Sequence, residues 1–131
     1  MSMSYQRADT TLNAALRNTA TPHIQLHTAN PGATGVASLA STTRKSIAFN
    51  APENHPSATS RRVLSSSGAT WTGAEIAASQ TVTHFSIWSA ATGGTVEFIS
   101  TVAVNKVVGS DGVAIASGAI EVILSVYAKP W

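Results

Sequence analysis

Polar and apolar residues alternate with a period of two over most of the chain after Pro22. Successive side chains of a strand point to opposite faces, so this alternation is typical of half-buried strands. Turn signals separate the alternating segments, which are 23–28, 43–49, 61–65, 81–89, 95–104, 113–116 and 119–127. The pattern predicts an all-β fold, a single antiparallel β-sandwich or barrel of about seven short strands, with one short N-terminal helix.

The helix is expected over residues 9–18, where Leu12, Ala15 and Leu16 have helical spacing. Asp9 or Thr10 would cap its start, and residues 1–7, which carry no periodic signal, are expected to be extended or mobile. The apolar stripe is narrow and needs a sheet or another subunit to cover it. Leu12 and Leu16 are therefore candidate interface residues.

The last four residues, Ala128-Lys129-Pro130-Trp131, end the chain on a large aromatic group. Leaving that ring in water forgoes about 2 kcal/mol of burial, so it either folds back on its own domain or anchors in a neighbouring subunit. Lys129, Pro130 and Trp131 join the candidate interface. The predicted organisation is an arm and helix over 1–20, a β-sandwich domain over 21–127, and a tail over 128–131.

Charged residues make up only 11% of the chain, against about a quarter in an average soluble domain. So few charges suggest that neighbouring subunits cover much of the surface. The absence of cysteine removes disulfides and zinc–sulfur sites, and the apolar runs are far shorter than the ~20 residues that span a bilayer. No signal segment is apparent at the start, so synthesis in the cytoplasm and no membrane partner are expected.

Catalytic chemistry lacks suitable residues. His23 and His27 share a strand face but lie ~13 Å apart, too far to bind one metal ion. Glu97 and Glu121 could be cross-strand neighbours, although a solvated strand face is favoured over a catalytic dyad. No nucleophile elbow or phosphate loop is present. We therefore expect no enzyme activity, no metal and no cofactor.

Two binding functions are weighed next. Arg44-Lys45 and Arg61-Arg62 could form one basic patch if their strands pair, but neighbours on a strand point apart and no aromatic platform accompanies them. Nucleic-acid binding is not expected. Trp71, Trp88 and Trp131 could stack on sugars, yet Trp88 lies in a core-like alternation, and Trp71 is expected to plug the core together with Ile76. A carbohydrate-binding module is the weaker alternative.

Three segments resemble a family of small tailed-bacteriophage virion proteins. Residues 23–35 (HIQLHTANPGATG) resemble its LYLALHTADPGxxG opening, residues 81–94 (TVTHFSIWSAATGG) its VTHFGIFDAATGG hairpin, and residues 118–122 (GAIEV) its closing strand. Among the departures, Asn30 replaces Asp, Ser86 replaces Gly, Ser89 replaces Asp, and a Gly-Tyr-Arg run is reduced to Thr42-Thr43-Arg44.

Several residues of these segments have physical roles in turns. Pro31 and Gly32 follow Asn30 in one turn, and Gly93-Gly94 lets the chain reverse between two strands. His27 and His84 are expected to hydrogen-bond loop backbone and hold these turns.

Members of the resembling family carry labels such as tail fibre, minor tail or head decoration protein. The resemblance implies a non-enzymatic virion structural protein, made in the host bacterial cytoplasm. Capsid decoration is the first expectation, because the chain is a stand-alone domain without a fibrous shaft. The alternative is a minor tail or tail-fibre protein that contacts a host receptor or glycan. Expected partners are the major capsid protein, other virion proteins and further copies of the chain.

Overall fold

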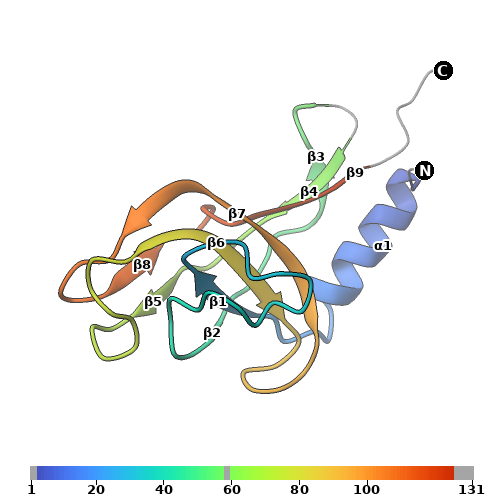
Figure 1. Ribbon diagram of the computed structural model, residues 1–131. Helices are drawn as coiled ribbons and strands as arrows, with labels where there is room; N and C mark the ends of the chain where they lie inside the picture. Colours follow the sequence, from blue (N-terminus) through green and yellow to red (C-terminus); the bar gives the residue numbers. More distant parts are fainter. Residues whose placement is uncertain (1–2, 58–59, 126–131) are drawn as a thin grey trace.

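The computed structural model describes residues 3–57 and 60–125 (Figure 1). Within them one helix, α1 (Tyr5–Leu16), precedes a series of antiparallel strands. The strands are β1 (His23–His27), β2 (Lys45–Ser46), β3 (Glu53–Asn54), β4 (Ser60–Leu64), β5 (Ala69–Trp71), β6 (Thr81–Trp88), β7 (Val96–Val107), β8 (Val113–Ile115) and β9 (Glu121–Ser125). The all-β prediction is confirmed. The strand count exceeds the expected number because β3 and β5 lie outside the seven alternating segments.

The described strands form three sheets: one of four strands in the order β2-β1-β6-β7, one of three in the order β3-β4-β9, and the pair β5-β8. All pairings are antiparallel. The sheets share one core and do not close into a barrel, which decides between the two predicted architectures.

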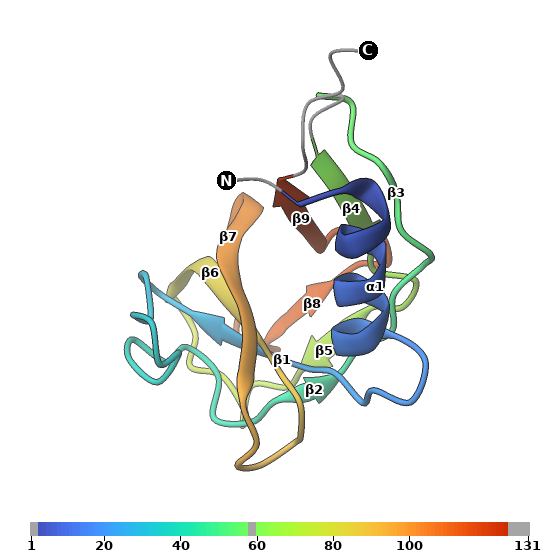
Figure 2. The ribbon, with the colours of Figure 1, turned by 90° about the vertical axis from the view of Figure 1, so that its right-hand side faces the viewer.

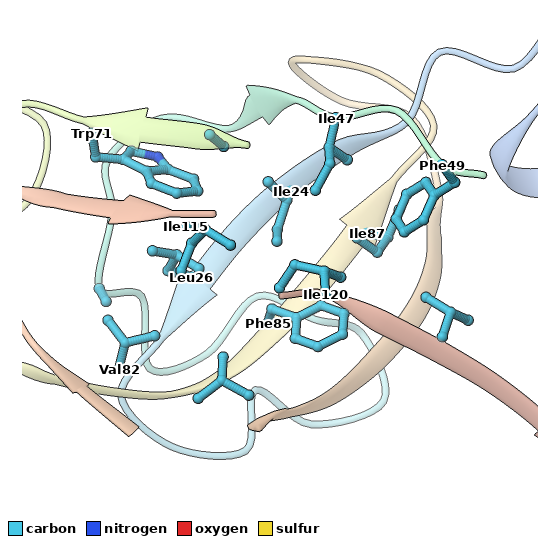
Figure 3. Close-up of a cluster of buried hydrophobic side chains, with 14 of the residues drawn as sticks. Ile24, Leu26, Ile47, Phe49, Trp71, Val82, Phe85, Ile87, Ile115 and Ile120 are labelled. Atoms are coloured by element: carbon cyan, nitrogen blue, oxygen red, sulfur yellow. The ribbon is translucent and has the colours of Figure 1, made fainter. Parts of the chain in front are cut away.

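The core lies between the four-stranded sheet and the two smaller sheets. Figure 3 shows side chains from β1 and β6 facing others from β5, β8 and Ile120, the residue just before β9. Trp71 and Ile76 are 0% and 1% exposed, as the sequence predicted. Trp71 enters the core from β5, and its indole Nε1 donates a hydrogen bond to the Thr43 carbonyl at 2.8 Å. The other labelled core residues are Ile24, Leu26, Ile47, Phe49, Val82, Phe85, Ile87, Ile115 and Ile120.

Strand β6 departs from strict alternation. Its pairing with β7 shifts register between Val82 and His84, where the extra residues of the bulge, 102–105, belong to β7. Val82 and Phe85 are both buried in the core, although strict alternation would put them on opposite faces of β6. On β7, Val104 lies within the bulge and is 74% exposed, whereas Val102, which alternation would place on the same face, is 9% exposed.

The helix starts earlier than predicted. Ser4 caps it, with its hydroxyl accepting a hydrogen bond from the Arg7 amide at 3.1 Å, so residues 5–7 are helical and not extended. Asp9 does not cap the helix. Its carboxylate accepts two hydrogen bonds from Arg61 of β4, at 2.7 and 2.9 Å, and these bonds join the helix to the sheet.

The two helix residues that were predicted to form an interface are part of the chain's own core. Leu12 and Leu16 are 0% and 2% exposed, because α1 lies alongside β4 (Figure 2) and both leucines pack in the chain's own core. Their side chains are not available to a neighbouring subunit in this conformation. Lys129, Pro130 and Trp131 lie outside the described residues, so their interface role stays a prediction. No helix in the described part of the chain is long and apolar enough to cross a membrane.

Candidate functional site

The two longest segments of the phage-like resemblance lie side by side. Strands β1 and β6 pair along their whole common length, from His23 opposite Trp88 to His27 opposite His84. The loop after β1 turns back toward the far end of β6. It passes so close to the Trp88 ring that a Cβ added at Gly35 would lie 3.0 Å from the ring. The loops 28–44 and 89–95 therefore meet beside Trp88, and we call this region the loop face.

A chain of hydrogen bonds runs beneath the loop face. The Trp88 indole Nε1 donates to the Ser86 hydroxyl at 2.8 Å, and that hydroxyl lies 2.7 Å from Nε2 of His27. The other ring nitrogen of His27, Nδ1, lies 2.9 Å from the Ala37 carbonyl. Because a carbonyl only accepts, Nδ1 carries the proton, and the Ser86 hydroxyl donates to the unprotonated Nε2.

The protonation of His27 agrees with this direction. Its side chain is fully buried, and burial lowers its pKa below the ordinary value. The neutral imidazole donates one hydrogen bond, to Ala37, and accepts one, from Ser86, so the His27 ring joins β6 to the 28–44 loop. The hydrogen bond from Nδ1 goes to loop backbone. His84 differs, since its ring contacts the hydroxyl of the adjacent Thr83 at 2.8 Å.

The turns above this network have the expected chemistry. The Asn30 side chain accepts a hydrogen bond from the Gly32 amide at 2.9 Å, and Gly32 has a φ of 78°. The Pro31 carbonyl accepts from the Ala37 amide at 3.2 Å, which closes the loop. In the other loop Gly93 and Gly94 have φ of 62° and 70°, a conformation that favours glycine.

Arg44 fastens the second loop to Trp88. Its guanidinium carbon lies 3.7 Å from the centroid of the Trp88 ring, a cation–π contact. Its Nη1 donates to the carbonyls of Ala90 and Gly93, at 3.0 and 2.7 Å. Burial lowers the pKa of Arg44 below its ordinary value. Sequence reasoning missed this residue as a site residue, although the reduced Gly-Tyr-Arg run at 42–44 was a signal.

Beside Arg44 the loop face is hollowed. The hollow has a volume of about 400 Å³ and is lined by Gln25, Thr42, Thr43, Arg44, Ala91, Thr92 and Gly93. We call it the Arg44 depression. Most of the lining residues have a polar side chain, and Arg44 is the one charged residue among them.

Other candidate sites are not assembled. Glu97 lies on β7 and Glu121 on β9, in different sheets, so the suggested cross-strand pairing is wrong. Lys45 lies on β2, directly after Arg44, and Arg61-Arg62 lie on β4; these two strands do not pair with each other. Within residues 3–57 and 60–125, no cluster of three or more His, Cys, Asp or Glu side chains could hold a metal ion.

The tryptophans do not form a sugar-stacking platform in the described part of the chain. Trp71 is fully buried, Trp88 is 7% exposed beneath Arg44, and Trp131 lies outside the described residues. Any sugar bound at the loop face would have to be recognised through polar groups.

Residues 2–123 match the sequence model of a family described as podophage GP4 fiber I protein gp80. The chain belongs to this family. Membership in the gp80 family makes it a bacteriophage structural protein of the virion, which confirms that part of the sequence-based expectation. No curated protein sequence matches the chain.

Proposed function

We propose that this protein is a non-enzymatic component of a podophage tail fibre, and that its loop face is turned toward the host cell. The match of nearly the whole chain to a fibre-protein family carries this proposal. It favours the tail over the capsid surface, which was the first expectation from sequence.

The geometry of the loop face supports a role in contact. Arg44 and His27 fix the two loops to the sheet through hydrogen bonds to Ala90, Gly93 and Ala37. Loops fixed in this way lose little conformational entropy when they bind a partner, which favours recognition by a preformed surface. The partner would be a receptor or glycan of the host surface.

Attachment to the particle needs a second surface. We assign this attachment to the C-terminal residues 128–131 of the chain, with Lys129, Pro130 and Trp131 packing on another virion subunit or on a further copy of this chain. A terminal aromatic ring is suited to anchoring because aromatic side chains dominate interface energetics. Val104 and Val107 of β7 are exposed apolar residues, and they offer a further surface for a neighbouring subunit to bury.

The location is tested by electron microscopy of phage particles with gold-labelled antibodies raised against the purified chain. Label confined to the tail fibres is expected. A regular lattice of label over the head would support capsid decoration instead, and the absence of label from particles would overturn both assignments. Antibody pre-absorbed with the purified protein is the control for non-specific label.

A further inference from the structure

We infer that the Arg44 depression binds the carboxylate of an acidic sugar. The inference deepens the proposed function, because it gives the chemical class of ligand for the host-facing loop face. The binding itself is a property of the isolated chain and can be tested without the particle.

Arg44 differs from Lys45, Arg61 and Arg62 in having no acidic partner among the described residues. Lys45 pairs with Glu75, Arg61 with Asp9, and Arg62 with Glu121 and Glu53. Half-buried Arg44 instead lies over the Trp88 ring and between two carbonyls. Its positive charge at the depression is therefore not neutralised by an ion pair.

The remaining hydrogen-bonding groups of Arg44 suit a carboxylate. Nη1 makes both hydrogen bonds to Ala90 and Gly93, and the N–H groups on Nε and Nη2 have no acceptor in the described part of the chain. Two N–H groups side by side in one plane match the two oxygens of a carboxylate. The fixed guanidinium adds little entropy cost to that pairing.

The rest of the lining offers acceptors for sugar hydroxyls. The Thr42 and Thr43 hydroxyls donate inward, to the carbonyl and the carboxylate of Glu75, and each can still accept a hydrogen bond from a ligand. The amide nitrogen of Gln25 donates to Ser41, which leaves its amide oxygen as an acceptor. The volume of about 400 Å³ lies within the range of small-ligand pockets.

Glu75 is the acidic group nearest to this lining, and Lys45 offsets its charge. With Arg44 the three side chains leave one net positive charge at the rim. A protein partner is less suited to the depression than a sugar, because the lining includes no aromatic side chain that could act as an anchor. Trp88, which could supply one, is 7% exposed.

The test is NMR titration of the purified chain with oligomers of galacturonic acid and of glucuronic acid, against uncharged galactose and glucose oligomers. We expect shifts of the Thr92 and Gly93 amide signals with the acidic oligomers alone, and weaker binding at higher salt. Equal binding of neutral oligomers, or binding of neither, would overturn the inference. Binding of an acidic peptide without binding of any acidic sugar would overturn it as well.

Two variants and one control sharpen the test. Thr92→Glu brings a negative charge to the rim at a residue without hydrogen bonds in the structure, and it should weaken binding by about tenfold. Arg44→Lys keeps the charge but loses the paired N–H groups, and it should weaken binding severalfold. Lys106→Met removes a cation from another surface, so it should leave binding unchanged.

The two variants together distinguish loss of a direct ligand contact from displacement of the 89–95 loop. Arg44 holds the 89–95 loop, so a loss of binding in Arg44→Lys could reflect a displaced loop; Thr92→Glu does not carry that ambiguity. If Thr92→Glu keeps its fold and binds acidic oligomers as well as the parent does, the inference is refuted. If antibody labels the tail fibres but no acidic sugar binds, the inferred ligand is wrong and the proposed location stands. If acidic sugars bind but antibody labels the head, the proposed location is wrong and the inferred ligand stands.

Discussion

The hydrogen bond between Trp88 and Ser86 should be visible as an energetic coupling between the two residues. We predict the outcome of a double-mutant cycle made of Ser86→Ala, Trp88→Phe and the variant with both changes. The Ser86 hydroxyl is fully buried and serves two groups, the Trp88 indole N–H and Nε2 of His27. Its removal leaves a buried donor and a buried acceptor without partners.

The magnitudes follow from those two groups. A buried donor left without an acceptor costs about 1–3 kcal/mol, so Ser86→Ala should lower the free energy of unfolding by about 2–4 kcal/mol. Trp88→Phe removes the N–H itself and leaves the Ser86–His27 bond intact, at a cost of about 1–2 kcal/mol from the smaller ring. In the double variant no indole N–H is left unpaired, so the combined loss should fall short of the sum by about 1–2 kcal/mol.

Urea unfolding of the four proteins, followed by circular dichroism at pH 7, measures the coupling. The matched control is a cycle of Ser86→Ala with Trp71→Phe, because Trp71 donates its hydrogen bond to Thr43 and shares no hydrogen-bond partner with Ser86. That cycle should be additive within about 0.5 kcal/mol. A coupling below this limit for Ser86 and Trp88 would refute the hydrogen-bond chain beneath the loop face.

Two further predictions concern the stability of the chain at acidic pH and the role of its C-terminal residues 129–131. Hydrogen bonds from Lys45 and from the Thr72 amide lower the pKa of Glu75 from 4.5 to about 2, so its charged form stabilises the fold above pH 4.5 and this contribution is lost as the pH falls toward 2. Glu75→Gln should flatten the fall of the unfolding free energy over that interval, and Glu97→Gln, whose carboxylate accepts a hydrogen bond from Thr95 on the same strand end, is the control that should not. Deletion of residues 129–131 should weaken association with virion partners in sedimentation assays and leave the melting temperature of the chain nearly unchanged; equal loss of both would mean that the tail belongs to the core.

The fold was predictable where the sequence carries a local signal. Alternation identified β1, β6 and β9, and the Asn30-Pro31-Gly32 and Gly93-Gly94 turns follow from backbone chemistry. The bulge in β7 could not be predicted, because it depends on the register with β6, which no local pattern records. Nor does alternation explain why Val82 and Phe85 both face the core.

The start of the helix was misjudged for a related reason. Asp9 is a good capping residue by type, and the apolar spacing began after it. In the structure the carboxylate has a stronger partner in Arg61, which lies more than fifty positions along the chain, and Ser4 caps the helix instead. A long-range ion pair of this kind overrides a local preference and cannot be read from the segment alone.

The loop face was only half predictable, and the departures from the resembling motif explain the other half. Where that motif has Gly and Phe, this chain has Ser86 and Trp88, and these two residues bond to each other. Tryptophan is a better cation–π partner than phenylalanine, so the larger ring holds Arg44 more firmly, and its added N–H needs the acceptor that Ser86 supplies. The two replacements therefore act together. Their combined effect is to fix the guanidinium of Arg44 in place at the depression, as the proposed role of the loop face in host contact requires.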